Sequence, residues 1–249
     1  MVDAITVQTF GGPTALFEYG GLRLLTDPTF DQPRTYVSPS GVTLTKLAPP
    51  AAPPAELGHV DVVLLSHDEP ADNLDDSGRA LLAEVPLTLT TVSGAGRLGG
   101  TARGLAPWES VQVGAVTITA VPARHGPEGC EPITGEVTGF VLTGEGLPSV
   151  YVSGDNAALE LVEQIAARFG PIDTALLFAG AVRTGLFDGA LLTLDSGQAA
   201  EAARILGARQ VVVVHFDSWA HFTEGRDDLV KAFTDAGLAD RVQLDRHGV

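Results

Sequence analysis

Hydrophobic and polar residues alternate over the first part of the chain. Segments 5–10, 15–19 and 22–26 all show this alternation, and they are separated by the glycine pairs Gly11-Gly12 and Gly20-Gly21. An alternating pattern places every second side chain on one face of a strand, and paired glycines are typical of tight turns. The chain is therefore predicted to open with a three-stranded meander.

Two later segments, 60–65 and 210–214, contain apolar runs without alternation. Such runs are typical of strands whose two faces are both buried. Strands are also predicted over 87–92, 110–113, 116–121, 138–142, 149–152 and 174–178, and helices over 74–84, 157–169, 196–206 and 226–236. Two β-rich halves with helices outside them predict an α/β fold, an αββα sandwich of two mixed sheets formed by one domain over residues 1–249.

Residues 31–58 do not fit this pattern. They are rich in Pro, Ser and Ala and show little periodicity. Unstructured connections of this length are uncommon in compact domains and are often functional. We therefore expect a long exposed loop that can cover a site.

The composition narrows the range of expected partners and substrates. The 249 residues include 15 basic and 31 acidic side chains, for a net charge of −16, and 45% are hydrophobic. An acidic surface repels nucleic-acid phosphates and anionic membranes, so neither is an expected partner, and a small-molecule substrate is. A single cysteine, Cys130, allows no internal disulfide, and no long apolar run or basic leader opens the chain. A cytoplasmic protein is expected, and the sequence leaves open whether it forms a homo-oligomer.

Side chains that can bind a metal ion lie where predicted strands end. His67, His125 and His215 each follow an apolar strand, and Asp155 follows the strand 149–152. Ligand sites in open α/β sheets lie beyond the carboxyl ends of strands. A lone histidine at a strand end is more often a hydrogen-bonded structural residue, but four metal-competent side chains in this position together indicate a metal site.

These segments resemble the metallo-β-lactamase superfamily, and within it the metal-dependent hydrolases related to ascorbate-phosphate lactonases and phospholipase D-like phosphodiesterases. The matching stretches are 21–28, 63–75, 120–125, 153–155 and 214–215. The resemblance implies that His67 and His125 bind a first metal ion, that Asp72 and His215 bind a second, and that Asp155 bridges them. It also implies a hydrolase of a small ester, lactone or phosphodiester.

The chain departs from the family motif His-x-His-x-Asp-His. Glu69 stands near the second histidine, Asn73 stands in place of the last, and Pro70-Ala71 adds one residue. Glu69 can bind a cation through oxygen, whereas the Asn73 amide is a poor zinc ligand. Oxygen donors favour harder ions and so shift the preference from zinc toward manganese or iron. The candidate ions are therefore zinc, manganese or iron, with one or two ions per chain.

Asp72 and His221 are the candidate catalytic residues. Asp72 is expected to orient the attacking water, with Asp155 as the alternative, and His221, six residues after His215, can protonate a leaving group. A surface or helix-capping role is the competing interpretation of His221. Arg124 can hold an anionic substrate or form a surface ion pair, and Asp27 can support a ligand histidine or form a turn.

Two rival functions remain at this point. The altered segment 67–73 is also compatible with a catalytically silent protein of the same fold that binds a ligand or partner. Gly94-Ala95-Gly96-Arg97-Leu98-Gly99 matches the spacing of a dinucleotide fingerprint, but the glycines and Pro107 that follow argue against the long helix it requires. Metal analysis separates the first rival from the hydrolase, and NAD(P) binding tests the second.

Overall fold

The opening meander forms as the alternation predicts and becomes one side of a six-stranded sheet. The computed structural model describes residues 5–37, 43–183 and 185–244. The strand order is β1-β2-β3-β6-β7-β8, antiparallel up to β3 and parallel beyond it. The strands are β1 (Val7–Gly11), β2 (Thr14–Tyr19), β3 (Leu22–Thr26), β6 (Val62–Leu64), β7 (Leu87–Thr90) and β8 (Ala102–Gly104).

The second sheet has seven strands in the order β15-β14-β13-β12-β11-β10-β9. The strands that come first in the chain, β9 to β12, are antiparallel, and β12 to β15 are parallel. The strands are β9 (Ser110–Val113), β10 (Val116–Pro122), β11 (Thr138–Thr143), β12 (Val150–Val152), β13 (Thr174–Phe178), β14 (Gln210–Val214) and β15 (Val242–Gln243).

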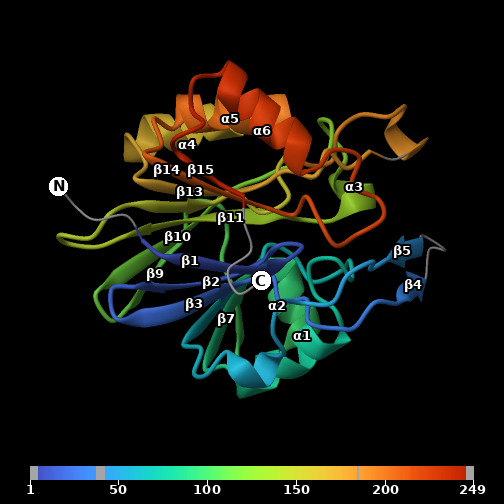
Figure 1. The fold of residues 1–249 in the computed structure, drawn as a ribbon. Helices are drawn as coiled ribbons and strands as arrows, with labels where there is room; N and C mark the ends of the chain where they lie inside the picture. The colour runs from blue at the N-terminus through green and yellow to red at the C-terminus, as the bar shows by residue number, and fades with distance from the viewer. Residues whose placement is uncertain (1–4, 38–42, 184, 245–249) are drawn as a thin grey trace.

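The two sheets face each other, and helices cover their outer faces (Figure 1). Val212 and Val214 of β14 pack into the core between the sheets, whereas Val211 and Val213 pack against the helical layer. This explains why the run has no polar alternation: both faces of the strand are buried. The arrangement confirms the predicted sandwich of two mixed sheets flanked by helices.

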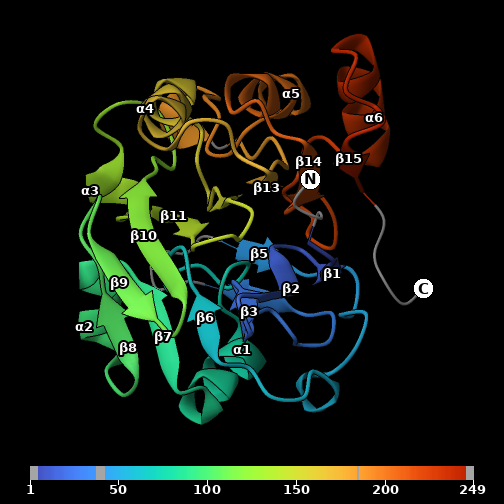
Figure 2. The same ribbon diagram turned by 90° about the vertical axis from the view of Figure 1, so that its left-hand side faces the viewer.

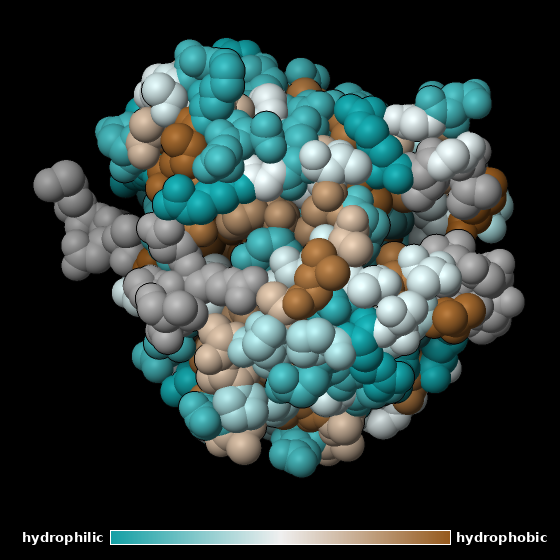
Figure 3. All heavy atoms as spheres, turned by 45° about the vertical axis from the view of Figure 1, so that its right-hand side comes forward, coloured by the Kyte–Doolittle hydropathy of each residue, from teal (hydrophilic) through white to brown (hydrophobic). Residues whose placement is uncertain are grey.

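Figure 2 shows α4, α5 and α6 on the outer side of the seven-stranded sheet, with α1 and α2 on the opposite side of the molecule. The helices are α1 (Asp76–Leu81), α2 (Val92–Leu98), α3 (Glu131–Thr134), α4 (Leu159–Phe169), α5 (Ser196–Ile205) and α6 (Arg226–Asp235), with 3-10 turns at Pro54–Glu56, Leu82–Glu84 and Gly185–Phe187. No helix in the described parts of the chain is long and apolar enough to span a membrane. Hydrophilic residues cover most of the face drawn in Figure 3.

The predicted loop 31–58 contains regular structure that its composition conceals. Strands β4 (Thr35–Val37) and β5 (Thr43–Thr45) form a separate antiparallel pair, and residues 38–42 between them lie outside the described residues. Four other short helices and strands, α2, β8, α3 and β15, were also not predicted. Short edge strands and single helical turns carry too few residues for a periodic signal.

The glycine-rich segment 94–99 belongs to the short helix α2. Thr91 caps this helix through a hydrogen bond from Gly94 N to its side chain, and the helix ends at Gly99 with φ 63°. A dinucleotide fingerprint requires a long helix after its glycines. The structure therefore gives the dinucleotide interpretation no support.

Gly78 is the position in α1 where a side chain cannot fit. A Cβ there would lie 1.8 Å from the Pro28 carbonyl oxygen, which is backbone and cannot rotate away. We expect Gly78→Ala to lower the free energy of unfolding by roughly 1–3 kcal/mol, as overpacking does. Urea unfolding measures this.

The control is Gly96→Ala in α2, where an added Cβ meets nothing within 4 Å. Alanine is favoured over glycine inside a helix by roughly 0.8–1 kcal/mol, so this variant should gain stability. Equal effects of the two substitutions would contradict the tight packing at Gly78.

Candidate metal centre

Residues at the ends of four strands from both sheets meet at one edge of the sandwich. His67, His125 and Asp155 each lie three residues beyond β6, β10 and β12, and His215 directly follows β14. One ligand atom from each of His67, His125 and Asp155 lies within 4.8 Å of the others, as a metal ion requires. The structure thus brings together three of the predicted ligands in one cluster.

The His67 imidazole is held ready to bind a cation. Ser66 Oγ donates to Asp27 Oδ2 at 2.5 Å and therefore accepts from His67 Nδ1 at 2.9 Å. This leaves Nε2 unprotonated, and Nε2 is buried without a hydrogen-bond partner. Burial lowers the pKa of His67 to about 4. A neutral imidazole with a free, buried nitrogen is the form that binds metals.

His125 is oriented in the same way by a different group. Its Nδ1 lies 2.8 Å from the Leu192 carbonyl oxygen. Because a carbonyl oxygen can only accept, Nδ1 carries the proton and Nε2 is the free nitrogen. Hydrogen bonds of this kind fix the tautomer of metal-binding histidines. The two rings lie 5.3 Å apart between centroids.

Asp155 reaches the cluster through a turn that needs glycine. Gly154 has φ 58°, and a Cβ on it would lie 2.6 Å from the Thr138 carbonyl oxygen. The Asp155 carboxylate is 1% exposed, and its Oδ1 accepts a hydrogen bond from Asn73 Nδ2 at 3.2 Å. Its Oδ2 lies 3.7 Å from His125 Nδ1.

A second group of side chains surrounds the Asp72 carboxylate. Asp72 Oδ2 lies 2.8 Å from His221 Nε2 and 3.4 Å from His215 Nε2, and His215 Nε2 lies 3.6 Å from Asp155 Oδ1. Burial opposes ionisation of Asp72, but the charge and hydrogen bond of His221 and the nearby charge of His215 outweigh it and hold the pKa of Asp72 well below the usual range. Asp72 is therefore an ionised carboxylate, and its Oδ1 is buried without a partner.

His215 adopts an unusual backbone conformation. Its φ is 61°, which side-chain-bearing residues rarely adopt, and Asp27 also has a positive φ of 24°. A Cβ on Gly180 would lie 2.4 Å from the His215 carbonyl oxygen, so glycine there makes room for it. Burial lowers the pKa of His215, but Asp155 and Asp72 raise it more, so the net shift is upward. Backbone strain at a buried histidine is typical of a functional position.

Asn73 connects two carboxylates in this structure. Its Nδ2 donates to Asp27 Oδ2 at 2.9 Å as well as to Asp155, and its Oδ1 is buried without a partner. Burial raises the pKa of Asp27 to about 7, against the opposing hydrogen bonds from Asn73 and Ser66. Of the two roles considered for Asp27, the contacts favour support of a ligand histidine, through Ser66.

Glu69 and Arg124 lie outside the cluster. The Glu69 side chain is 46% exposed and pairs with Arg97 at 3.2 Å, so the structure does not bring this predicted ligand to His67, His125 and Asp155. Arg124 pairs with Glu160, which matches the ion-pair interpretation. Cys130 is buried and free.

The atoms without partners fit a divalent cation. Buried polar atoms normally have hydrogen-bond partners, and exceptions point to an unseen ligand. Here the imidazole nitrogen of His67, both ring nitrogens of His215 and Oδ1 of Asp72 lack one. Sequence reasoning missed Ser66 and the Leu192 carbonyl, which orient the histidines, because neither a serine nor a backbone carbonyl carries a sequence signal for this role.

Ser66 offers a direct test of this orientation. Ser66→Ala removes the acceptor for His67 Nδ1, so the ring is free to rotate or to change tautomer. Loss of such a partner typically reduces metal affinity 10–100-fold, and we expect a weakening of roughly tenfold, measured by zinc titration in a calorimeter. Ser149→Ala, at a part-exposed serine bonded to Asp173, is the control. An unchanged zinc affinity in Ser66→Ala would show that the hydroxyl does not orient His67.

Comparisons with known proteins identify the family of the chain. The family model described as "Beta-lactamase superfamily domain" matches residues 22–216. A UPF0173 metal-dependent hydrolase of Methanosphaerula palustris is 29% identical over 179 residues, which cover 69% of this chain and 75% of the relative.

Solved structures share the fold over nearly the whole chain. An isothiocyanate hydrolase from Delia radicum gut bacteria has a TM-score of 0.82 and 21% identity, covering 98% of this chain and 97% of that one. A possible metal-dependent hydrolase from Veillonella parvula has a TM-score of 0.84 and 18% identity, covering 99% and 98%.

Proposed function

The chain belongs to the metallo-β-lactamase superfamily, and from this premise we propose that it hydrolyses an ester, lactone or phosphodiester bond of a small molecule with the help of a divalent ion. The observation that supports this most directly is the cluster of His67, His125 and Asp155. Relatives of the chain carry the name metal-dependent hydrolase.

His67, His125 and Asp155 would hold the first ion, and Asp72, His215 and Asp155 a second. A divalent ion at such a site supplies Lewis acidity, which lowers the pKa of water and polarises the bond to be cleaved. Zinc, manganese and iron are the candidate ions. Glu69 would have to leave its pairing with Arg97 to act as a further oxygen ligand.

Asp72 would orient the attacking water, and His221 would protonate the leaving group. Asp72 is ionised, and its unpaired Oδ1 can accept a hydrogen bond that orients the attacking water. His221 bonds to Asp72 through Nε2 and is 20% exposed, so it connects the carboxylate to the outside of the site. It can deliver a proton to the leaving oxygen as the scissile bond breaks.

The charges beside the site favour an uncharged acyl substrate. Arg97 pairs with Asp68 at 2.5 Å and with Glu69, and Arg124 pairs with Glu160. These guanidinium groups are therefore already neutralised by carboxylates, in a chain of net charge −16. A phosphate ester would have only the bound ion to balance its charge. We therefore place esters and lactones ahead of phosphodiesters.

The test is hydrolysis of three probes by protein loaded separately with zinc, manganese or iron. The probes are 4-nitrophenyl butyrate, a γ-lactone and bis(4-nitrophenyl) phosphate. The ester or lactone should be cleaved, Asp72→Asn should lose most of this activity, and His59→Ala, at an exposed histidine, should keep it. Faster cleavage of the phosphodiester would reverse the substrate order.

A catalytically silent binding protein is the second candidate, and Asn73 is the observation that favours it. Asn73 occupies the motif position of a histidine and is engaged by Asp27 and Asp155. Protein that binds metal in full yet cleaves none of a broad panel of esters, lactones and phosphodiesters would support this candidate. A small molecule is its expected ligand, as for the hydrolase.

A further inference from the structure

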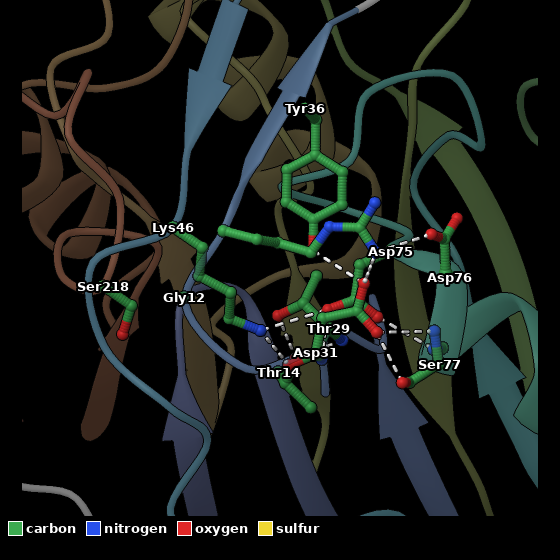
Figure 4. Close-up of polar contacts among 12 residues, drawn as sticks. Gly12, Thr14, Thr29, Asp31, Tyr36, Lys46, Asp75, Asp76, Ser77 and Ser218 are labelled. Carbon is green, nitrogen blue, oxygen red and sulfur yellow. Dashed lines mark hydrogen bonds and ion pairs between the residues drawn. The ribbon is translucent and has the colours of Figure 1, made fainter.

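A buried lysine lies close to the proposed catalytic pair. The Lys46 side chain is 2% exposed, and its Nζ contacts Asp75 Oδ2 at 3.1 Å and the Thr29 carbonyl oxygen at 2.9 Å. Figure 4 shows its ammonium group pointing toward these oxygens. The mechanism proposed above makes no use of this ion pair.

Hydrogen bonds hold Asp75 in place on the segment that also carries Asp72. Its Oδ1 accepts from Gly78 N at 2.8 Å, which caps α1, and its Oδ2 also accepts from Asp31 N at 2.7 Å. The carboxylate is fully buried. Asp75 lies three residues after Asp72, so its position is coupled to that of the Asp72 carboxylate.

Backbone hydrogen bonds join the chain around Lys46 to the loop that carries His221. Leu47 N donates to the Ser218 carbonyl oxygen at 2.7 Å, and Ala220 N donates to the Thr45 carbonyl oxygen at 2.9 Å. Lys46 and Trp219 thus form a short antiparallel bridge. The Trp219 ring lies 5.6 Å from Lys46 Nζ and 6.1 Å from the His221 ring. The bridge ends one residue before His221.

These contacts form a continuous path that begins and ends at Asp72. It runs from Asp72 along the chain to Asp75, across the ion pair to Lys46, through the bridge to Ala220 and His221, and back to Asp72 over the 2.8 Å contact. We propose that the buried Lys46–Asp75 pair is a positioning device that holds His221 against Asp72. This inference rests on the proposed function, which makes Asp72 and His221 the catalytic residues.

Electrostatics supports a positioning role over a purely stabilising one. A buried ion pair gains little net stability over apolar side chains of the same shape, because desolvation offsets the attraction. It does fix the two segments in one arrangement, since either charge alone would be buried without compensation. Here that arrangement sets the distance between Asp72 and His221, the two proposed catalytic residues.

Lys46→Met tests the device, with Asp75→Asn as the second variant because asparagine also caps helices well. Small displacements of catalytic groups cost up to roughly 100-fold in rate, and we expect kcat for 4-nitrophenyl butyrate to fall roughly tenfold or more with KM nearly unchanged. Lys231→Met is the control, since Lys231 is 77% exposed on α6 and pairs with Asp235. Metal content and the fraction folded are measured in parallel.

A double-mutant cycle separates positioning from general stability. If Lys46 acts through His221, adding Lys46→Met to His221→Ala should cause no further loss of kcat. A structural role unrelated to His221 predicts that the two losses multiply. Multiplying losses would therefore overturn the proposal.

A measurement without substrate keeps the inference separate from the proposed function. The chain has six histidines, so side-chain ¹⁵N NMR spectra are simple to assign with His221→Ala. Lys46→Met and Asp75→Asn should shift the His221 signals and leave those of His67 and His125 in place. Unshifted His221 signals in a folded variant would overturn the proposal, whether or not any probe is hydrolysed. If a variant does not fold, Lys46→Met/Asp75→Asn, which leaves no uncompensated charge, takes its place.

Discussion

Purified His125→Ala protein is expected to contain much less divalent metal than the unmodified protein and to unfold at a lower temperature. His125 Nε2 is the free nitrogen of an oriented imidazole within the cluster. Removing it leaves His67 and Asp155 as the first-ion ligands. An ion present at 100 to 1,000 times its dissociation constant stabilises the folded state by roughly 2.7–4.1 kcal/mol. The loss corresponds to roughly 5–15 °C in a domain of this size.

Two measurements check this expectation: elemental analysis after gel filtration, and thermal unfolding with and without a chelator. The chelator should lower the Tm of the unmodified protein toward that of His125→Ala and should affect the variant little. His59→Ala is the matched control, because His59 is 68% exposed and pairs with Asp61, away from the cluster. Metal content that is unchanged in His125→Ala would remove this residue from the ligand set.

Much of the fold could be predicted because its strands have two kinds of sequence signal. Alternation marks the meander, and unbroken apolar runs mark strands such as β14, whose valines pack on both faces. The strand ends also bring His67, three residues after β6, and His215, directly after β14, to the same edge of the sandwich, since the first residues after a buried strand have little freedom to lie elsewhere. The position of a strand end is therefore readable from sequence.

The direction of side chains in loops could not be predicted. Glu69 stands two residues from His67 in sequence, yet it points to Arg97, because the path of the turn after β6 decides its direction. Asn73 was expected only to weaken a metal site. Its hydrogen bonds to Asp27 and Asp155 join residues 46 and 82 positions away, and such contacts leave no local pattern.

The hairpin of β4 and β5 shows the same limit. Its residues are partly exposed, so no apolar periodicity marks them. The buried Lys46 that follows pairs with Asp75, and the strand bridge to Trp219 connects it to a segment more than 170 residues away. Lysine is normally exposed, so sequence alone predicts the opposite environment for it.

Metal titration of the unmodified protein should reveal an asymmetric site. The half with His67, His125 and Asp155 offers two oriented imidazoles and a carboxyl group within 4.8 Å. In the other half, Asn73 directs its amide nitrogen toward Asp27 and Asp155 and so contributes no donor nitrogen to an ion beside Asp72. One ion should bind tightly and a second roughly tenfold or more weakly, since imidazole is the stronger ligand for zinc and similar ions.

Three variants distinguish the halves in a calorimetric titration with zinc. His215→Ala should abolish the weak binding event and keep the strong one. His125→Ala should abolish the strong binding event and keep the weak one. Asn73→His with Ala71 deleted restores the usual length and the missing imidazole, and it should raise the metal stoichiometry or the rate of ester hydrolysis. Two ions bound with equal and full occupancy in the unmodified protein would contradict the asymmetry, because the Asp72 half would then hold its ion without a nitrogen from position 73.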